Sequence, residues 1–342
     1  MIICITESRA KFEPAVRLLV MSLAKHSPAV PVYLVFPQAT HNFRRWLANF
    51  QQVTLSTHRV ELTGSFNVKP QAMLHLMEKG HDEVLWIDSD IVIGRDIVSL
   101  LAEVPPDTVV VTEESLWGWH DDTDAWRARG WGFEVGRVLP FALNAGVVRA
   151  TRLHEPLLRR WAQLIESRKY QEVQQLDWRS RPPHMHGDSE VWTALLSSAE
   201  FAHIPLKILT RGQDIIQYFG PYGFTVWERL SCLFGQSPAF IHSLGPSKPW
   251  IREWRSVAAN GIKEYLEAVY LDLSPYTLAA TEYRMGLEGN ASWLDVHYTL
   301  SAVLRAVGLW QCSLVGLPIA IIADLNRLIK SLLPLRLRKV NR

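Results

Sequence analysis

The chain has 342 residues, of which 48% are hydrophobic and 20% are charged, and its formal net charge is +2. This composition is typical of a globular chain with a substantial apolar core and excludes a disordered protein. A net charge so close to zero offers no global electrostatic attraction for nucleic acid, so we expect no nucleic-acid partner. The length predicts at most two domains, or one large α/β domain with an appendage.

The three cysteines lie far apart in the sequence, at Cys4, Cys232 and Cys312. They form no C-x-x-C pair, so neither a zinc knuckle nor a disulfide framework is indicated, and this usage fits a reducing cytoplasm. The apolar run that opens the chain, Ile2–Thr6, is too short for a signal peptide and is typical of a first β-strand.

Strand and helix patterns alternate through the first third of the chain. Short apolar runs bounded by proline, glycine or polar residues predict strands, and apolar residues at helical spacing predict helices. In chain order the pattern predicts strand 2–6, helix 14–25, strand 32–36, helix 43–50, strand 53–56, a helix from Pro70 to before Gly80, strand 84–87, a helix capped by Asp96, and strand 108–112. We therefore expect an α/β fold with a mostly parallel, doubly wound sheet. No G-x-G-x-x-G follows the first strand, so the dinucleotide fingerprint of a dehydrogenase is absent.

Two carboxylates follow the apolar strand at 84–87: Asp88 and Asp90, with Ser89 between them. In open parallel sheets ligands bind at the carboxyl ends of the strands, and two carboxylates held there suit a hard cation. A motif as short as D-x-D also occurs by chance, and the alternative is an ordinary strand-to-turn junction whose acids point at water.

The regular alternation stops between residues 113 and 140. This segment mixes acids with Trp117, Trp119, Trp126 and Trp131. A long irregular segment inside a compact domain is commonly functional, and tryptophan offers a flat apolar face that suits a sugar. Trp119 is therefore a candidate substrate-binding residue. A strand at 143–148 and a helix at 153–166 are predicted to follow.

Asn144, Ala145 and Gly146 place small side chains on the predicted strand at 143–148. Small residues let a ligand approach the backbone closely, and a tightly packed core strand explains them equally well.

Asp188, Ser189 and Glu190 precede an apolar helical stretch. Asp188 is predicted to be the N-cap of that helix, with Glu190 facing the helix dipole. A capping acid there is also well placed to meet a substrate hydroxyl.

The segment from His242 to Trp250 joins an imidazole, a glycine turn at Gly245 and a cation at Lys248. A neutral imidazole can complete a carboxylate site for a borderline cation such as Mn²⁺, and a lysine can bind a phosphate as a point charge. A single histidine is more often an ordinary hydrogen-bonded residue than a metal ligand, so its sequence context matters here.

Four segments together resemble retaining glycosyltransferases with the GT-A fold, in particular glycosyltransferase family 8, which includes glycogenin and bacterial lipopolysaccharide galactosyltransferases. In the family's order they are a D-x-D after an apolar strand, an N-A-G strand, a D-x-[DE] helix start, and H-x-x-G-x-x-K-P-W. The last motif is the most specific and the D-x-D is the least. The resemblance implies a GT-A catalytic domain over residues 1–255 and a helical C-terminal region over 256–342.

The resemblance implies transfer of a hexose from a nucleotide-diphosphate donor, preferably UDP-linked, to a glycan or lipid-linked acceptor, with retention of configuration. It implies that Asp88, Asp90 and His242 hold Mn²⁺, or alternatively Mg²⁺, on the donor diphosphate. The further implied contacts are Thr6 near the base, Asn144, Ala145 and Gly146 around the donor sugar, Gly245 and Lys248 over the diphosphate, Asp188 on a hydroxyl, and Lys69 and Ser89 elsewhere on the donor.

Two departures from the family pattern limit these expectations. Family members commonly have D-Q-D at the helix start, with the Gln facing the reacting carbon, whereas here Ser189 stands between Asp188 and Glu190. The catalytic group opposite the leaving group is therefore unassigned among these three residues. The segment after Thr6 is Glu-Ser-Arg and not an Asp-rich turn, which leaves the base open.

Three other functions are alternatives to a glycosyltransferase. Ser189 keeps open a catalytically silent nucleotide- or sugar-binding protein on the same fold. A nucleotidyltransferase is disfavoured because no glycine-rich phosphate loop follows the first strand. Two carboxylates and one histidine would suffice for a metal-dependent hydrolase, but the K-P-W context argues against it.

The C-terminal region contains a span of 18 uncharged residues, from Ala306 to Ala323, at the lower limit for crossing a bilayer. Pro318 and two glycines weaken a spanning helix. Basic residues interleaved with Leu and Ile follow and predict a helix on an anionic membrane surface, hence a peripheral location at the inner face: Arg327, Lys330, Arg336, Arg338, Lys339 and Arg342. The alternative is a helical hairpin packed on the catalytic domain.

Overall fold

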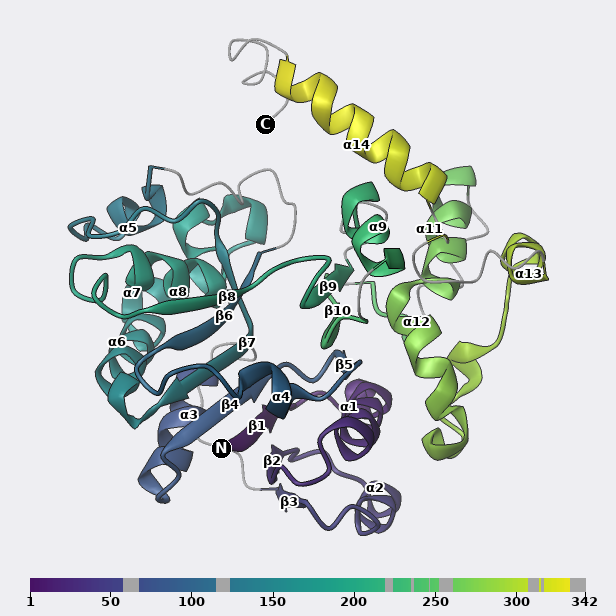
Figure 1. The fold of residues 1–342 in the computed structure, drawn as a ribbon, viewed down its shortest axis with the longest axis horizontal. Helices are drawn as coiled ribbons and strands as arrows, with labels where there is room; N and C mark the ends of the chain where they lie inside the picture. Colours follow the sequence, from purple (N-terminus) through teal and green to yellow (C-terminus); the bar gives the residue numbers. More distant parts are fainter. Residues whose placement is uncertain are drawn as a thin grey trace. The chain divides into compact units, whose positions relative to one another are not determined.

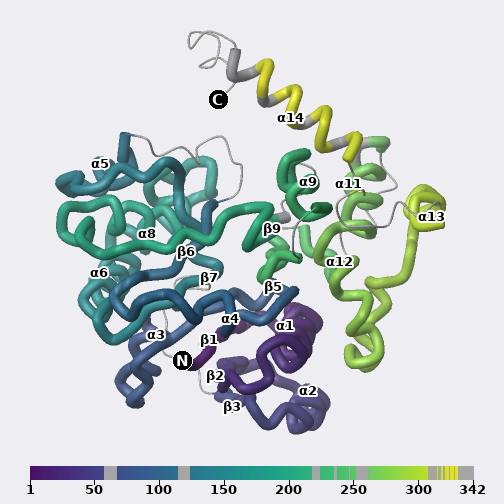
Figure 2. Tube along the Cα trace, in the orientation of Figure 1, coloured from purple at the N-terminus to yellow at the C-terminus, as the bar shows by residue number. Residues whose placement is uncertain are grey.

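The computed structural model describes residues 1–57, 68–114, 124–218, 224–234, 237–245, 247–251, 261–306, 314 and 317–332 (Figures 1 and 2). The chain divides into two compact units, Met1–Thr210 and Arg211–Arg342. The expected boundary after residue 255 lies outside the described residues, so the domain limits 1–255 and 256–342 stay predictions. His242 and Lys248 belong to the second unit.

A seven-stranded sheet forms the centre of the first unit, in the order β3-β2-β1-β4-β7-β6-β8. Strands β1, β2, β3 and β4 pair in parallel, as do β6 and β8, whereas β7 is antiparallel to both of its neighbours. The predicted α/β fold with a mostly parallel sheet is confirmed. The strands are β1 (Ile2–Thr6), β2 (Val32–Val35), β3 (Val53–Ser56), β4 (Glu83–Ile87), β6 (Val109–Glu113), β7 (Leu143–Thr151) and β8 (Leu206–Leu209).

The antiparallel direction of β7 brings its first residues to the edge where β4 and β6 end. Ile87 pairs with Val147, and Thr112 pairs with Asn144. Beyond the end of β4, the backbone N–H of Asp88 still donates to the carbonyl of Gly146 at 2.8 Å. The D-x-D segment and the Asn-Ala-Gly segment, far apart in sequence, therefore lie side by side.

Helices cover the sheet of the first unit, with α3, α6 and α8 on the same side in Figure 1. These three helices share one apolar core with β4 and β7, in which the rings of Trp161 and Trp192 lie 4.4 Å apart. Alternate residues of β1 and β4 face this core, and the residues between them are also buried, so both faces of the sheet are covered. The helices are α1 (Glu13–His26), α2 (His41–Leu47), α3 (Lys69–Glu78), α4 (Ile97–Leu101), α5 (Trp126–Gly130), α6 (Glu155–Glu166), α7 (Arg168–Gln174) and α8 (Asp188–Ser197).

Local capping explains several of these boundaries. Asp96 caps α4 as predicted, accepting from the backbone N–H of Val98 at 3.0 Å and of Ser99 at 3.1 Å. The predicted N-cap at Asp188 is wrong by one residue, because Gly187 is the N-cap of α8 and Asp188 is its first residue. Strand β5 (Ile91–Ile93), directly after the D-x-D, packs against α1 through a hydrogen bond from the Ile93 N–H to Ser22 Oγ at 3.1 Å.

The second unit is mostly helical in its described residues. Its strands β9 (Ile215–Tyr218) and β10 (Phe240–Ser243) pair in parallel. Trp250 packs against Tyr276 and Trp293, with ring centroids 5.1 Å and 6.4 Å away. The helices are α9 (Val226–Phe234), α11 (Ile262–Asp272), α12 (Pro275–Ala280), α13 (Thr299–Ala306) and α14 (Leu317–Leu332).

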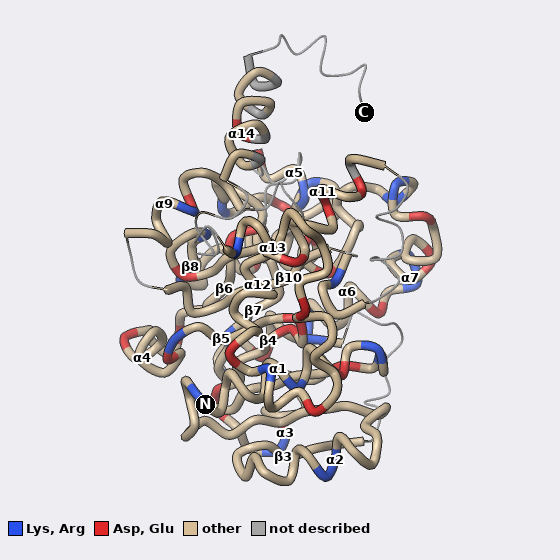
Figure 3. The backbone as a smooth tube through the Cα atoms, turned by 90° about the vertical axis from the view of Figure 1, so that its right-hand side faces the viewer, with Lys and Arg blue, Asp and Glu red and all other residues tan. Residues whose placement is uncertain are grey.

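Short 3₁₀ turns link these elements in both units. They lie at Ala10–Phe12, Arg152–His154, Trp178–Ser180, Pro183–Met185, Thr281–Leu287 and Ser292–Leu294. Within the described residues, none of the helices is both long enough and apolar enough to cross a bilayer. Basic and acidic residues are both spread over the described part of the chain (Figure 3).

Candidate functional site

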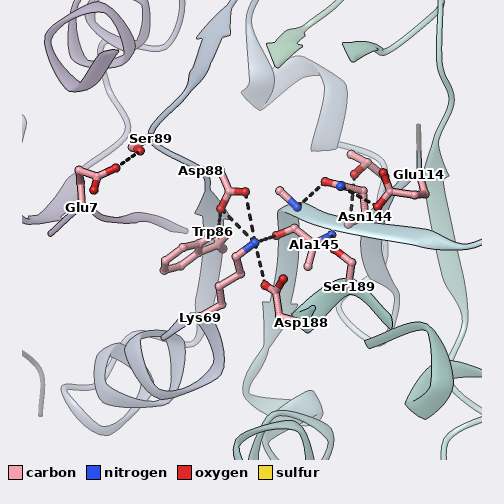
Figure 4. A network of polar contacts seen from close by, with 12 residues as sticks. Glu7, Lys69, Trp86, Asp88, Ser89, Glu114, Asn144, Ala145, Asp188 and Ser189 are labelled. Atoms are coloured by element: carbon pink, nitrogen blue, oxygen red, sulfur yellow. Dashed lines mark hydrogen bonds and ion pairs between the residues drawn. The ribbon is translucent and has the colours of Figure 1, made fainter. Parts of the chain in front are cut away.

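Three acids line the carboxyl edge of the sheet. Glu7 follows β1, Asp88 follows β4 and Glu114 follows β6. β1 is parallel to β4, and β4 and β6 are both antiparallel to β7, so all three strands end at the same edge. Figure 4 shows the three carboxylates spread along it. Of the three, sequence reasoning singled out only Asp88, although an acid directly after a parallel strand is a signal that also points to Glu7 and Glu114.

Lys69 lies at the centre of this network (Figure 4). Its ammonium is 3.1 Å from Oδ1 and 3.2 Å from Oδ2 of Asp88, and 3.0 Å from Oδ2 of Asp188. It also donates to the carbonyl of Ala145 at 2.9 Å. Burial by itself would lower the pKa of Lys69, but the carboxylates of Asp188 and Asp88 outweigh burial and raise it. Lys69 is therefore a fixed positive charge between two predicted site carboxylates.

Asp88 is also held from the strand side. The indole Nε1 of Trp86 donates to Asp88 Oδ1 at 2.7 Å. The Asp88 side chain keeps 24% of its surface exposed, whereas Asp90 is 9% exposed as a residue. Asp88 is thus oriented by contacts with Trp86 and Lys69 while remaining accessible to a ligand.

Asn144 and Gly146 form a second part of the network, on β7. The Asn144 amide donates from Nδ2 to Glu114 Oε2 at 2.9 Å and accepts, through Oδ1, from the Gly146 N–H at 2.7 Å. Between them, the Ala145 N–H donates to Ser189 Oγ at 3.1 Å. These bonds join β6, β7 and the first turn of α8, so all three N-A-G residues lie at the same edge as Asp88.

Glu190 closes the first turn of α8 by accepting from the backbone N–H of Gly187 at 3.0 Å. Burial, followed by the charge of Glu114, raises the pKa of Glu190 to about 7, and the buried Arg127 opposes this shift. Glu190 therefore changes charge near neutral pH. Asp188 faces Lys69, whereas the Ser189 hydroxyl accepts from β7, so the three adjacent residues have three different environments.

Ser89, the middle residue of the D-x-D, contacts a residue that sequence reasoning missed. Its hydroxyl donates to Glu7 Oε2 at 2.6 Å. Arg9 binds the same carboxylate with three hydrogen bonds at 2.8 Å, from its backbone N–H, Nε and Nη2. The Glu-Ser-Arg turn after Thr6 is thus tied to the D-x-D, and Thr6 itself is the half-buried last residue of β1.

The residues predicted in the second unit lie on and after β10. His242 is on β10, where it pairs with Gln217 of β9, and is 1% exposed. Lys248 is 6% exposed and donates to the carbonyl of Ser243. Gly245 has φ +80°, a left-handed conformation in which other residues are strained. The H-x-x-G-x-x-K segment therefore folds back on itself at the glycine.

The tryptophan-rich segment is only partly described, and Trp119 lies outside the described residues. Trp131 is described, and its ring stacks on Phe133 and Tyr170 at 6.2 Å and 6.3 Å between centroids. Its Nε1 donates to the carbonyl of His184 at 3.0 Å. Trp131 therefore packs against the helices of the first unit, and the sugar-binding role of this segment stays a prediction.

No protein-family model and no curated protein matches the chain. Among solved structures, the chain is similar to the galactosyltransferase LgtC in complex with donor and acceptor sugar analogues (14% identity, 84% of this chain and 100% of that chain covered, TM-score 0.45). It is also similar to mouse xyloside xylosyltransferase 1 (14% identity, 71% and 96% covered, TM-score 0.46). A third is a glycosyltransferase involved in glycosylating the major capsid of PBCV-1 (13%, 72% and 95%, TM-score 0.41). At these low identities and TM-scores, the likeness by itself assigns no activity.

Proposed function

We propose that the chain is a metal-dependent glycosyltransferase that moves a sugar from a nucleotide-diphosphate donor, preferably UDP-linked, to a glycan or lipid-linked acceptor. The observation that carries this proposal is the sheet edge at which the Asp88 carboxylate, the 144–146 segment and Asp188 meet around Lys69. Such an edge offers carboxylates for a cation and amide and carboxylate groups for sugar hydroxyls within one polar network.

Asp88, Asp90 and His242 are a ligand set that suits a divalent cation. Two carboxylates and one imidazole combine hard and borderline donors, which fits Mn²⁺ and also permits Mg²⁺. When bound, the cation would neutralise the charge that develops on the departing diphosphate. Lys248, after the left-handed turn at Gly245, would add a positive charge for a phosphate.

The side chains at the start of α8 favour substitution on the same face of the sugar, with retention. A covalent intermediate needs an available nucleophile, but Asp188 is paired with Lys69 and the Ser189 hydroxyl is bound to β7. Asp188 and Asn144 would instead hold sugar hydroxyls, and Glu190 would hold a proton near neutral pH. NMR of the product anomer tests this, since an inverted product rejects it.

The decisive experiment is Asp90→Asn with Mn²⁺ and a panel of nucleotide sugars. We expect turnover to fall on the order of 100- to 1,000-fold, because one preorganised charge that supports the leaving group is lost. Asp82→Asn is the matched control, since Asp82 is 85% exposed and pairs with Arg152 at the surface. Unchanged Mn²⁺-dependent turnover by Asp90→Asn rejects the metal assignment. Nucleotide binding by the wild type without transfer or hydrolysis would favour the silent binding protein.

The location at a membrane surface is a further part of the proposal. Helix α14 exposes Ile321, Ile322, Leu325, Leu328 and Ile329, which recur at the spacing of one helix face. Asp324, the only acid after residue 316, accepts from the backbone N–H of Val226 in α9 at 2.9 Å, and the charged residues that follow it are all basic. An apolar face followed by basic residues fits the surface of an anionic bilayer.

Co-sedimentation with vesicles tests this location. We expect the full chain to bind vesicles that contain anionic lipid and to lose binding in Leu325→Glu/Ile329→Glu. Met285→Glu is the control, because Met285 is 91% exposed but lies outside α14. Equal binding of the double variant and the wild type rejects α14 as the contact. No binding of the wild type to these vesicles rejects the membrane location.

A further inference from the structure

Lys69 uses all three of its donors on the protein. An ammonium has three N–H groups, and the structure supplies three acceptor groups: Asp88, Asp188 and the Ala145 carbonyl, all within 3.2 Å. They come from three elements: the end of β4, the start of α8 and the start of β7. Lys69 is 7% exposed, so little of it is available to solvent. This arrangement differs from the substrate-binding role that the resemblance implies for it.

We propose that Lys69 is a positioning residue that makes metal binding depend on the nucleotide diphosphate. The inference rests on the proposed function, because it takes Asp88 as a metal ligand. Both oxygens of Asp88 already lie within 3.2 Å of the ammonium. A divalent cation that binds Asp88 would therefore meet a like charge at close range, in a partly buried site where screening by water is weak.

The diphosphate relieves this repulsion. Its negative charge attracts both the cation and the ammonium, so the cation should bind the protein weakly alone and much more tightly together with the nucleotide. Binding free energies are reciprocal, so the metal must strengthen nucleotide binding by the same factor. The lysine thus favours entry of the metal as its nucleotide complex and disfavours a bare metal ion at Asp88.

Asp188 gives the inference a second, opposite test. The ammonium divides its charge between Asp88 and Asp188, whose side chain is only 13% exposed. If Asp188 is made neutral, the full charge of Lys69 acts on Asp88 and should weaken binding of the metal alone. If Lys69 is made neutral, the repulsion disappears and the metal alone should bind more tightly. A merely structural role for Lys69 predicts loss of metal binding in both variants.

The experiment measures free Mn²⁺ by electron paramagnetic resonance during titration of the full chain, with and without UDP. We expect UDP to tighten Mn²⁺ binding by the wild type on the order of tenfold or more, within the usual range of coupling between sites. Lys69→Met should bind Mn²⁺ alone several-fold more tightly and lose most of the UDP effect, whereas Asp188→Asn should bind Mn²⁺ alone more weakly. Lys79→Met, at the exposed end of α3, should behave as the wild type.

The possible failures are distinguishable. If Lys69→Met binds Mn²⁺ alone no more tightly than the wild type while the wild type binds Mn²⁺ with UDP, the inference is wrong and the proposed function stands. If the wild type binds no Mn²⁺ with UDP or with any other nucleoside diphosphate, the proposed function fails and the inference fails with it. Thermal melting identifies a variant that does not fold. If Lys69→Met melts at a much lower temperature than the wild type, the test rests on Asp188→Asn. The inference is then wrong if Asp188→Asn binds Mn²⁺ without UDP as tightly as the wild type or more tightly.

Discussion

The two units of the molecule expose very different surfaces. Among the described residues, five exposed large apolar side chains lie in the 210 residues of the first unit, and fifteen lie in the second, shorter unit. The first unit instead places its polar groups at the sheet edge, where Lys69, Asp88 and Asn144 pair across separate elements. The exposed apolar side chains on helices α9, α11, α13 and α14 need another surface to cover them, whereas the first unit already buries most of its large apolar side chains.

This difference has a physical origin in the way each unit buries its chain. A sheet covered by helices buries whole strands, and polar residues are left at the strand ends, where they are held rigidly. A set of short helices buries only one stripe of each helix. We therefore expect substitutions of large side chains to affect stability strongly in the first unit and weakly on the helix faces of the second.

The largest loss of stability is expected for Trp161→Ala in α6. Trp161 is fully buried and its ring lies 4.4 Å from that of Trp192, so the substitution leaves a large cavity. Loss of a buried aromatic side chain costs about 3–5 kcal/mol of unfolding free energy. Urea denaturation monitored by circular dichroism measures this loss. A loss below about 1 kcal/mol would contradict a tightly packed first unit.

A smaller loss of stability is expected for Glu7→Gln. The Glu7 carboxylate is 4% exposed as a residue and accepts from Arg9 and Ser89, so the change removes the charge from a charge-assisted network. We expect a loss of about 1–3 kcal/mol in urea denaturation. Glu103→Gln, at an exposed position, is the control. Equal stability of the two variants would show that the contacts of Glu7 with Arg9 and Ser89 contribute little to the stability of the fold.

Most strands and helices of the first unit were predicted from the sequence, because apolar runs and their proline and glycine boundaries are local signals. The edge strand β8 was not predicted. β5 was missed because its three residues are too few to show a period. The misplaced N-cap at Asp188 has a local cause too, since Gly187 has no side chain to suggest a cap and Glu190 reaches back to its N–H.

The site was less predictable than the fold. Asp88, Asn144 and Asp188 were recognised one motif at a time, but the ammonium of Lys69 joins segments 19 and 76 residues away in sequence, and no local pattern reveals such a contact. The antiparallel direction of β7 decides which residues meet Asp88, and strand direction is not encoded in apolar periodicity. The turn at Glu7 was noticed only as a departure from the family pattern.

Glu190→Gln is expected to change how stability depends on pH. The folded chain holds the Glu190 proton up to a pKa of about 7, whereas the ordinary value is 4.5. Between these two values the folded state binds more protons than the unfolded state, so this residue makes stability fall as pH rises from about 4.5 to about 7 and adds no further change above. The Gln variant lacks this dependence. Its melting temperature, relative to the wild type, should be higher at pH 8 than at pH 5, and a difference that is independent of pH would contradict the raised pKa.

The smallest effect on stability is expected for Trp227→Ala in α9, the matched partner of Trp161→Ala. Trp227 is 73% exposed, so little buried surface is lost, and the change in unfolding free energy should stay within about 0.5 kcal/mol. The same variant should bind anionic vesicles less tightly, because α9 contacts α14 and exposes Trp227 and Phe234. Urea denaturation and vesicle co-sedimentation separate the two effects. A strongly destabilised Trp227→Ala would mean that this face of α9 is covered in solution, and the contrast between the two units would then be one of missing partners and not of architecture.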